Sequence, residues 1–491
     1  MNILFVAAEL APHAKVGGLA DVAAALPQAL AEAGHAVSVA VPLHRGLKKS
    51  GEFRRTHLEL QVPVANGTWA TRVWQGRRGG VSLFGIEREE YFDRPHPYGE
   101  GGGDYPDSLD RFVFFSRAAV ELARYIDPVP EVLHANDWHT ALIPALAAVI
   151  RLPMRSVFTI HNLRYQGEFP SSEFPKLGLP AEMFRPETLE FYGKVNLLKG
   201  AVLLADVVTT VSPSYAREIQ TEEFGHGLHE VLKGRAAHVT GILNGIDEES
   251  WNPAADPALP RSFRSSAQQG REECRAALEA ELGLEPANGR PIFGMVTRLT
   301  PDKGVDLALE AAEGLVAKGG RLAILGTGEP GLEQAAHDLA KRLPGRVAVR
   351  LEHHEELARR IFGGTDFFLM PSRTEPCGLT QMYAMRYGAV PVVADTGGLH
   401  DSVEAWHGSK KSGCGIRFPA GTKAGIRQGL DQALALWDEP AMMKTARLHG
   451  MKRDWSWGAA VPAYDHVYRS SAGLPSPGRK KKTKGTLACR N

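Results

Sequence analysis

The chain has 491 residues, of which 43% are hydrophobic and 23% charged, and its 57 lysines and arginines nearly balance 56 aspartates and glutamates. This length predicts two large domains, and a net charge of +1 gives no reason to expect nucleic acid or a membrane surface as a partner. The four cysteines lack zinc-site spacing, and no signal peptide or membrane-spanning apolar run is recognised, so a cytoplasmic location with reduced thiols is expected.

Strand and helix patterns alternate in the first half of the chain. The predicted strands are apolar runs at residues 3–8, 36–42, 72–75, 81–86, 131–135, 156–160 and 206–211. A glycine-rich turn at 76–80 joins two of them into a hairpin, and residues 93–106 are expected to form a loop. Helical periodicity is found at 19–30, at 108–125 and from about residue 140. This alternation predicts a parallel sheet with helices on both faces.

The same alternation restarts in the second half. Residues 245–290 are rich in Pro, Ser and Gln and indicate an interdomain region, with one helix at 271–282. Strands are predicted at 291–296, 321–325, 347–351, 366–370 and 390–394, and helices between them include 306–317 and 355–362. The expected fold class is α/β, with two tandem doubly wound, Rossmann-like domains that face each other across a deep cleft.

The predicted domain limits are residues 1–245 and 246–470, and the last helices of the second domain are expected to pack back on the first. Residues 471–491 form a polar, basic tail without periodicity that is expected to be disordered. Binding of the tail to nucleic acid or another anionic polymer is the weaker alternative.

Lys15 and the pair Gly17-Gly18 lie between the first predicted strand and the first predicted helix. A glycine pair lets the backbone approach a ligand closely, and the free amides at a helix start favour an anion. The alternative is an ordinary tight turn with a solvated lysine. The spacing does not match the G-x-G-x-x-G pattern of dinucleotide-binding turns, so these residues alone leave both interpretations open.

Two further polar residues follow strands of the first domain. Asp137 comes after the strand at 131–135, and His161 comes after the strand at 156–160. Ligands bind at the carboxyl ends of parallel strands, which favours a functional role. The alternatives are that Asp137 caps a helix and that His161 is a hydrogen-bonded structural histidine.

Three charged residues follow strands of the second domain. Arg298 and Lys303 flank one turn and fit a diphosphate, the arginine as a planar fork and the lysine as a point charge. Two solvated surface cations are the alternative. Glu375 precedes a helix start at 378–381 that suits an anion, and such an unfavourable place for a carboxylate indicates function.

Taken together, these motifs resemble the glycogen and starch synthase family of bacteria and plants, over nearly the whole chain up to about residue 470. The resembling segments are KVGGLADV (15–22), NDWHT (136–140), TIHNLRYQGEFP (159–170), NLLKG (196–200), TTVSPSYAREIQTEEFGHGL (209–228), NGIDEESWNP (244–253), TRLTPDKG (297–304), PSRTEPCGLTQMYAMRYG (371–388) and DTGGLHDSV (395–403). No single segment would identify the family, but the occurrence of all these segments in this order is very specific.

The resemblance implies a glycosyltransferase of the GT-B class, in which the second domain binds the nucleotide sugar. It implies transfer of glucose from ADP-glucose to the non-reducing end of an α-1,4-glucan, glycogen, with retention of configuration and without a metal or other cofactor. The alternatives are UDP-glucose as donor, a catalytically silent glucan-binding homologue and a nucleotide-sugar epimerase. Nucleotide release that depends on added glucan would distinguish the transferase from the last two.

The resemblance also assigns residues to roles. The implied catalytic residues are Glu375, His161, Arg298 and Lys303, and those on the acceptor side are Glu9, Asp21 and Asn162. The implied donor-binding residues are Lys15, Gly17, Gly18, Asp137, Arg298, Lys303, Cys377, Gly378, Leu379 and Thr380. Five positions depart from the patterns of the family and its wider relatives, namely Val16, Arg164, Thr374, Tyr383 and Ala394. Tyr383 replaces the second glutamate of the wider motif, which agrees with the glycogen synthase branch.

The expected mechanism follows from where charge develops as the bond between the sugar and the diphosphate breaks. Arg298 and Lys303 would stabilise the negative charge on the leaving diphosphate, and no Asp-x-Asp motif is present to hold a metal. A covalent mechanism needs two carboxylates about 5 Å apart, and only Glu375 is evident, so front-face attack by the acceptor hydroxyl is expected. Lys15 is expected to reach the donor only when the domains close.

Overall fold

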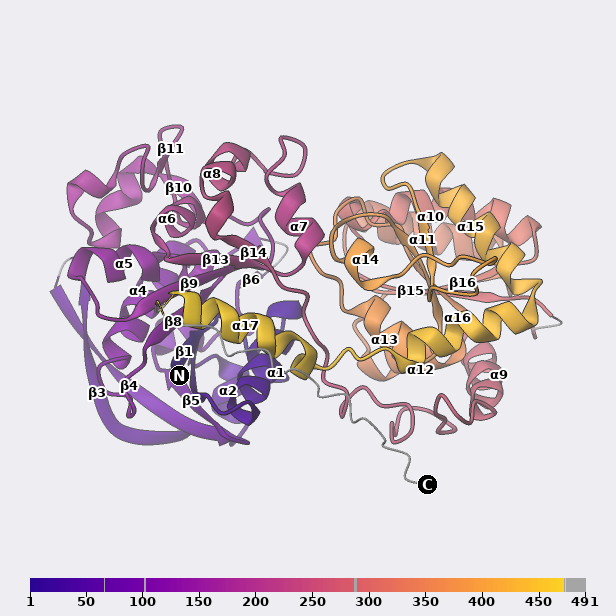
Figure 1. Ribbon diagram of the computed structural model, residues 1–491, viewed down its shortest axis with the longest axis horizontal. Helices are drawn as coiled ribbons and strands as arrows, with labels where there is room; N and C mark the ends of the chain where they lie inside the picture. Colours follow the sequence, from indigo (N-terminus) through magenta and orange to yellow (C-terminus); the bar gives the residue numbers. More distant parts are fainter. Residues whose placement is uncertain (66, 101–102, 287–288, 472, 474–491) are drawn as a thin grey trace, which may run out of the picture.

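The computed structural model describes residues 1–65, 67–100, 103–286, 289–471 and 473, which form two α/β lobes side by side (Figure 1). The first lobe holds a nine-stranded sheet and the second a six-stranded sheet. The expected pair of doubly wound domains is thereby confirmed, whereas the residue limits given for the domains stay a prediction. The basic tail lies outside the described residues, except for Ser471, which ends the last helix, and residue 473.

The sheet of the first lobe has the strand order β14-β13-β9-β8-β1-β2-β5-β4-β3 and is parallel except for its β5-β4-β3 edge. Its strands are β1 (Asn2–Val6), β2 (Ala36–Pro42), β3 (Arg54–Val64), β4 (Gly67–Arg78), β5 (Val81–Ile86), β8 (Val132–Asn136), β9 (Arg155–Ile160), β13 (Val207–Thr210) and β14 (Val239–Gly241). The predicted hairpin is β4–β5. The two edge strands, β3 and β14, were not predicted, because β3 is largely exposed and β14 has only three residues.

Helices cover both faces of this sheet. They are α1 (Gly18–Glu32), α2 (Arg45–Lys49), α3 (Glu89–Phe92), α4 (Ser108–Leu122), α5 (Leu142–Ile150), α6 (Leu197–Leu204), α7 (Pro213–Glu218) and α8 (His229–Gly234), with 3₁₀ turns η1 (Trp138–Thr140), η2 (Ser171–Leu177), η3 (Ala181–Met183) and η4 (Ala236–His238). A three-stranded sheet is added by β10 (Glu168–Pro170), β11 (Glu190–Phe191) and β12 (Lys194–Asn196). The expected loop at 93–106 contains two short paired strands, β6 (Gly99–Glu100) and β7 (Gly103–Asp104).

The sheet of the second lobe is parallel throughout, with the order β17-β16-β15-β18-β19-β20. Its strands are β15 (Ile292–Val296), β16 (Arg321–Leu325), β17 (Val347–Arg350), β18 (Phe367–Met370), β19 (Val390–Ala394) and β20 (Ile416–Phe418). Its helices are α9 (Gly270–Leu282), η5 (Pro301–Lys303), α10 (Val305–Ala317), α11 (Pro330–Arg342), α12 (Glu355–Gly364), α13 (Thr380–Arg386), α14 (Gly397–Ser402), α15 (Lys423–Trp437) and α16 (Pro440–Lys452). Only β20, three residues long, was not predicted.

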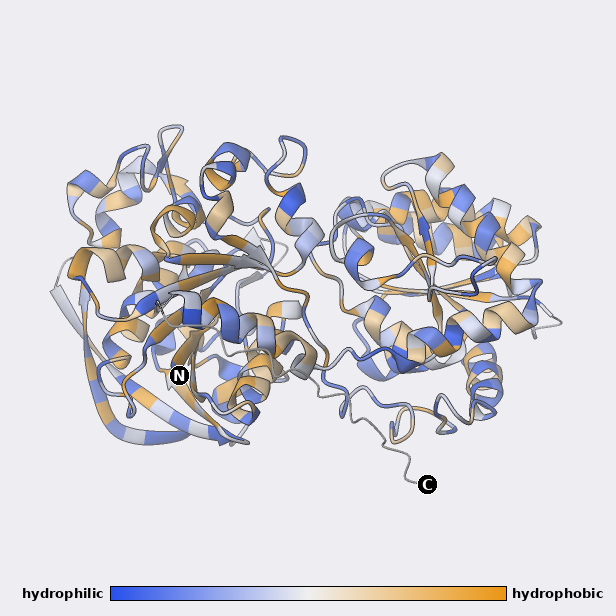
Figure 2. Ribbon diagram, viewed as in Figure 1, coloured by the Kyte–Doolittle hydropathy of each residue, from blue (hydrophilic) through white to orange (hydrophobic). Residues whose placement is uncertain are grey.

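Figure 2 shows apolar residues concentrated in the strands of both sheets and on the helix faces that cover them. In α1, for example, Leu19, Ala23, Leu26 and Leu30 are all buried, as their helical spacing predicts. Each lobe therefore builds its own core around a central parallel sheet.

The last helix, α17 (Trp457–Ser471), returns from the second lobe and lies against α1 in the first (Figure 1). Its Trp457, Tyr464 and Tyr468 are buried in the core of the first lobe. The hydroxyl of Tyr468 shares a hydrogen bond of 2.8 Å with Nδ1 of His134 on β8. The chain therefore crosses between the lobes twice.

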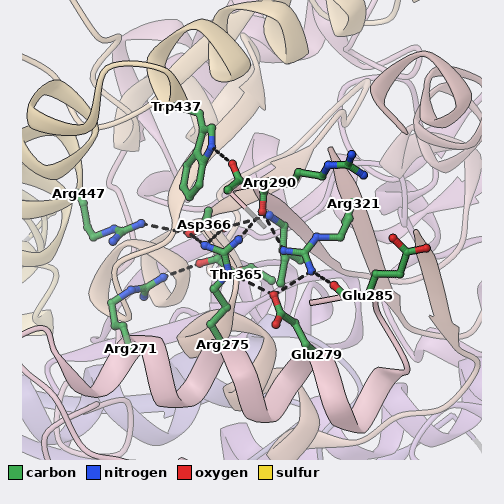
Figure 3. A network of polar contacts seen from close by, with 12 residues as sticks. Arg271, Arg275, Glu279, Glu285, Arg290, Arg321, Thr365, Asp366, Trp437 and Arg447 are labelled. Atoms are coloured by element: carbon green, nitrogen blue, oxygen red, sulfur yellow. Dashed lines mark hydrogen bonds and ion pairs between the residues drawn. The ribbon is translucent and has the colours of Figure 1, made fainter. Parts of the chain in front are cut away.

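A buried network of arginines and carboxylates fastens α9 to the sheet of the second lobe (Figure 3). Arg321, fully buried, donates to Oε1 of Glu279 and to the carbonyl oxygen of Arg290, each at 2.8 Å. Arg275 on α9 lies 3.2 Å from Asp366. These contacts lie at the amino ends of β16 and β18, so the network stabilises the lobe at the edge opposite the carboxyl ends of the strands.

Candidate active site

The residues predicted to act in catalysis or to bind the donor lie after strands of both sheets, toward the carboxyl ends of those strands. In chain order they are the turn at 15–18 after β1, Asp137 after β8, His161 after β9, Arg298 after β15 and Glu375 after β18. The two lobes approach each other here, because a Cβ atom placed on Gly18 would lie 3.5 Å from Cδ1 of Leu379 in the second lobe. The fold thus brings the predicted residues of both halves toward one interface.

A buried glutamate shapes the turn that carries Lys15. Oε2 of Glu9 accepts hydrogen bonds from the backbone amides of Val16 at 2.7 Å and Gly17 at 3.0 Å. Its other oxygen accepts one from the hydroxyl of Tyr98 at 2.7 Å. Burial raises the pKa of Glu9, and these three donors act in the opposite direction. Glu9, predicted on the acceptor side, therefore supports the backbone of the Lys15 turn.

Lys15 is paired within its own turn. Its Nζ lies 2.8 Å from Oδ1 of Asp21 on α1, and the two side chains are 29% and 27% exposed. Burial raises the pKa of Asp21, and the positive charge of Lys15 opposes that shift. An exposed ion pair contributes about 0–1 kcal/mol, so little free energy opposes transfer of Lys15 from Asp21 to an incoming anion.

Asp137 and the turn after β9 form one unit. Asp137 has a positive φ of 56°, and its Oδ1 accepts hydrogen bonds from the backbone amides of His161 at 2.7 Å and Asn162 at 3.4 Å. Its side chain makes no capping hydrogen bond to η1, so the helix-cap interpretation is wrong. Burial raises the pKa of Asp137 to about 7.

His161 is held as a neutral imidazole. Its Nε2 lies 2.9 Å from Oδ1 of Asn136. The amide nitrogen of Asn136 donates to the carbonyl oxygens of Val6 and His134, so its oxygen is the acceptor and Nε2 of His161 carries the hydrogen. Burial lowers the pKa of His161 to about 3. The neutral ring therefore presents Nδ1 as a hydrogen-bond acceptor rather than an acid.

In the second lobe, Lys303 and Glu375 form a buried ion pair. Nζ of Lys303 lies 2.8 Å from both carboxylate oxygens, and the two side chains are only 15% and 9% exposed. The hydroxyl of Ser372 donates to the same carboxylate at 3.0 Å. Arg298, on the same turn as Lys303, is exposed, and its guanidinium makes no ion pair or hydrogen bond to any described residue. The negative charge of Glu375 is thus neutralised by Lys303, whereas Arg298 has no partner among the described residues.

The residues after Glu375 form a tight turn against α14. Gly378 has φ of 68° and Gly397 has φ of 44°, both in the left-handed region that favours glycine. A Cβ atom on Gly397 would lie 2.0 Å from the carbonyl oxygen of Glu375. Burial raises the pKa of the Cys377 thiol to about 12, so it is not a nucleophile. Thr380 begins α13, two residues later than the helix start predicted at Gly378.

The departures from the family pattern have distinct places. Arg164, 55% exposed, lies 3.4 Å from Asp302 of the other lobe. Tyr383 is buried and stacks on Trp251 with ring centroids 3.9 Å apart, so this position belongs to the core. Val16 is 54% exposed at the mouth of its turn. The hydroxyl of Thr374 makes no hydrogen bond to any described residue, and Ala394 is buried at the end of β19.

Three residues without a predicted role support the site, namely Tyr98, Ser372 and Tyr215. Ser372 follows β18 by two residues, a strand-end position that could have indicated it. Tyr98 lies in the predicted loop at 93–106, where its hydroxyl donates to Glu9. Tyr215 lies on α7, where its hydroxyl accepts a hydrogen bond from the amide of Leu163 at 3.0 Å. No local pattern shows either contact, because both partners are distant in sequence.

The described residues contain no group of three or more His, Cys, Asp or Glu side chains that could hold a metal ion. None of the helices in this part of the chain combines the length and apolarity needed to cross a membrane.

Comparison with known proteins gives matches over both lobes. The family model of the starch synthase catalytic domain matches residues 2–234, and that of glycosyl transferases group 1 matches residues 283–447. Glycogen synthase of Anaeromyxobacter dehalogenans (strain 2CP-C) is 42% identical over 96% of this chain and 100% of its own. Glycogen synthase of Syntrophotalea carbinolica is 41% identical, with coverages of 96% and 99%.

Solved structures agree. The catalytic domain of starch synthase IV from Arabidopsis thaliana, bound to ADP and acarbose, superposes with a TM-score of 0.88 at 34% identity, covering 96% of this chain and 99% of its own. Sucrose-phosphate synthase from Thermosynechococcus elongatus superposes with a TM-score of 0.61 at 16% identity over the same shares of the two chains, which shows a common fold alone. The chain therefore belongs to the glycogen and starch synthase family, whose members are glucosyltransferases of the GT-B fold.

Proposed function

We propose that this enzyme transfers glucose from ADP-glucose to the non-reducing end of an α-1,4-glucan, with retention of configuration and without a metal. The observation that carries the proposal is the set of charged groups after β15 and β18, in which Lys303 is paired with Glu375 while Arg298 has no partner among the described residues. The ADP and acarbose bound to the Arabidopsis relative support the choice of a nucleotide donor and a glucan-like acceptor.

Arg298 and Lys303 stabilise the charge that develops on the leaving diphosphate. Arg298 is exposed and unpaired in the described structure, so it can contact the diphosphate without first breaking an ion pair. Lys303 stays bound to Glu375, which fixes its Nζ in one place. Donors held in advance at the position of developing charge lower the barrier without further reorganisation. This pair stabilises the negative charge on the leaving phosphate, as a metal ion does in phosphoryl-transfer enzymes.

Glu375 serves as an orienting carboxylate and not as a covalent nucleophile. Both of its oxygens are bound to Lys303, and Oε2 also accepts from Ser372, so three of its roughly four lone-pair sites are already engaged. The acceptor hydroxyl attacks from the face that the diphosphate leaves, and the departing phosphate takes its proton. Retention of configuration then needs no glucosyl-enzyme. A glucosyl group trapped on Glu375 would contradict this mechanism.

Lys15, Asp137 and His161 complete the site from the first lobe. We assign Lys15 to a contact that forms when the lobes close, when the diphosphate replaces Asp21 as its partner. Neutral His161 and its neighbour Asn162 face the transferred sugar, with Asp137 holding the turn that carries them.

The three described cysteines are free thiols, which supports a reducing, cytoplasmic setting.

A donor competition assay tests the proposal. The purified enzyme is incubated with glycogen and with equal concentrations of ADP-glucose and UDP-glucose, and release of each nucleotide is measured with and without glycogen. Release of ADP that depends on glycogen and exceeds release of UDP is expected. Preferential release of UDP would show that the donor is UDP-glucose rather than ADP-glucose. Nucleotide release without glycogen, or none with either donor, would overturn the transferase assignment.

A further inference from the structure

Helix α7 contacts both halves of the candidate active site. It belongs to the first lobe and lies beside α14 of the second lobe, where the two lobes approach each other (Figure 1). We name residues 161–163 the His161 turn and residues 372–378 the Glu375 turn. The hydrogen bonds of α7 reach both turns.

On the side of the first lobe, Tyr215 holds the His161 turn. Its side chain is buried, and its hydroxyl oxygen accepts the hydrogen bond from the backbone amide of Leu163 at 3.0 Å. Leu163 follows His161 and Asn162 directly, and the amides of those two residues bind Asp137. Three consecutive amides of the turn are thus fixed by side chains from outside it, and one of these side chains comes from α7.

On the side of the second lobe, α7 holds the Glu375 turn. The hydroxyl of Ser212, which caps α7, donates to the carbonyl oxygen of Pro376 at 2.8 Å. Oε1 of Glu218, at the other end of α7, accepts from the amide of Gly397 at 2.7 Å. The next amide, of Gly398, donates to the carbonyl oxygen of Glu375 at 2.9 Å. The turn is thereby fastened to α7 directly and through the start of α14.

A third contact joins the same two helices. Asp401 on α14 accepts hydrogen bonds from both the backbone amide and the hydroxyl of Ser214, each at 2.7 Å. Asp401 ends the repeat of the Gly-Gly-Leu-x-Asp pattern that first occurs at 17–21. In the first lobe the aspartate of that pattern pairs with Lys15, whereas in the second it binds α7. The repeated pattern therefore serves contacts between the lobes as well as a turn at the site.

We propose that α7 is a positioning element of the catalytic site, which ties the His161 turn of the first lobe to the Glu375 turn of the second. This inference rests on the proposed glucosyl transfer for its kinetic readout and on the described contacts for its structural one. Tyr215 is a positioning residue, because it acts through the amide of Leu163. Burial and the negative charges of Asp137, Glu218 and Glu375 raise the pKa of Tyr215, which keeps the hydroxyl neutral.

Tyr215→Phe tests the first-lobe contact and Ser212→Ala the second-lobe contact. Tyr215→Phe keeps the ring and removes only the oxygen that accepts from Leu163. Tyr468→Phe is the matched control, because it loses a buried hydrogen bond to His134 and none of the described hydrogen bonds of its side chain involves α7 or either turn. We expect kcat to fall about tenfold in Tyr215→Phe, with the donor KM changed less than twofold, and to stay at the wild-type value in Tyr468→Phe.

The double variant shows whether α7 acts as one unit. If α7 joins the two turns, detaching either end releases the other, so Tyr215→Phe/Ser212→Ala should lose little more activity than the more damaged single variant. Losses that multiply would show two independent contacts and overturn the proposal, as would a wild-type kcat in Tyr215→Phe.

Amide hydrogen exchange tests the same coupling without activity. We expect Tyr215→Phe to raise exchange in peptides covering both 161–165 and 375–379, and Tyr468→Phe to raise it in neither. A rise confined to 161–165 would overturn the proposal even in an active enzyme. An inactive wild-type enzyme with the expected exchange pattern would instead contradict the proposed function and leave the positioning role supported.

Discussion

Nζ of Lys303 lies 2.8 Å from Oε1 and 2.8 Å from Oε2 of Glu375, so one ammonium group is shared equally by the two oxygens of one buried carboxylate. A pair of this kind has no net charge. The cation left to meet a diphosphate on this turn is Arg298, which has no partner among the described residues. Whether a charged side chain in the site has a partner determines how its substitution should affect activity and stability.

Arg298→Ala should lower kcat by about 10²–10³, because it removes one charge partner of the leaving diphosphate. Stability should change by less than about 0.5 kcal/mol, since the side chain is exposed and unpaired. Steady-state nucleotide release and thermal unfolding measure the two effects. Arg342→Ala, which alters an exposed arginine on α11, is the control and should retain full activity. Wild-type turnover in Arg298→Ala would remove Arg298 from the site.

Glu375→Gln should lower kcat by about 10²-fold and tighten the binding of ADP. The activity falls because the ammonium of Lys303 loses the carboxylate that fixes it. ADP binds more tightly because the positive charge of Lys303 is no longer neutralised before the diphosphate arrives. Isothermal titration calorimetry with ADP measures the affinity. Weaker binding of ADP would show that Glu375 aids the diphosphate in the ground state.

Asp137→Asn should make the enzyme more stable at pH 8 than the wild type. Burial raises the pKa of Asp137 from 3.8 to about 7, so the folded state binds this proton more tightly than the unfolded state. The free energy of unfolding therefore falls as the pH rises from about 4 to 7, by at most about 4 kcal/mol. Amide hydrogen exchange in the first lobe of both proteins at pH 4.5 and pH 8, corrected for the intrinsic exchange rate at each pH, measures it. A difference between them that does not grow with pH would contradict the shifted pKa.

Arg321→Met should destabilise the second lobe by about 1–3 kcal/mol, because it removes the donor to the carbonyl oxygen of Glu285 and leaves Glu279 with Arg275, at 3.4 Å, as its cation. Hydrogen exchange resolved by lobe is the suitable measurement, since a chain of two lobes need not unfold in one step. Arg321→Met/Glu279→Leu should recover part of the loss, because the buried carboxylate that has lost one of its two arginines is then absent. Equal stability of Arg321→Met and wild type would show that the network in Figure 3 contributes little.

Gly397→Ala should reduce activity more than stability. A Cβ atom there would lie 2.0 Å from the carbonyl oxygen of Glu375, and φ of 44° is unfavourable for alanine. Gly314→Ala on α10 is the matched control, because no described atom outside the backbone of its own helix and its two chain neighbours lies within 4 Å of its Cβ position. Alanine should stabilise that helix by up to about 1 kcal/mol. Nucleotide release and thermal unfolding of both variants test the difference. Full activity in Gly397→Ala would show that the Glu375 turn tolerates displacement.

Most strands of both sheets could be predicted because burial on both faces leaves continuous apolar runs in the sequence. The run at 36–42 became β2 and the run at 390–394 became β19, each with the predicted limits. The strands that were not predicted lack this signal. β3 is exposed along most of its length, and β10, β11, β12, β14 and β20 have only two or three residues each. The short strands β6 and β7 lie in a glycine-rich segment, where periodicity carries no information.

The sequence by itself determined the alternation of strands and helices, the family and the positions of charged residues at strand ends, because these depend on local periodicity and on motifs. The partners of those residues were decided only by tertiary structure. Lys303 binds Glu375, Lys15 binds Asp21, and Asp137 binds the turn after β9. Even Lys15 and Asp21, six residues apart, meet only because the chain turns between β1 and α1. A contact depends on the path of the backbone between two groups, and local sequence patterns do not report that path.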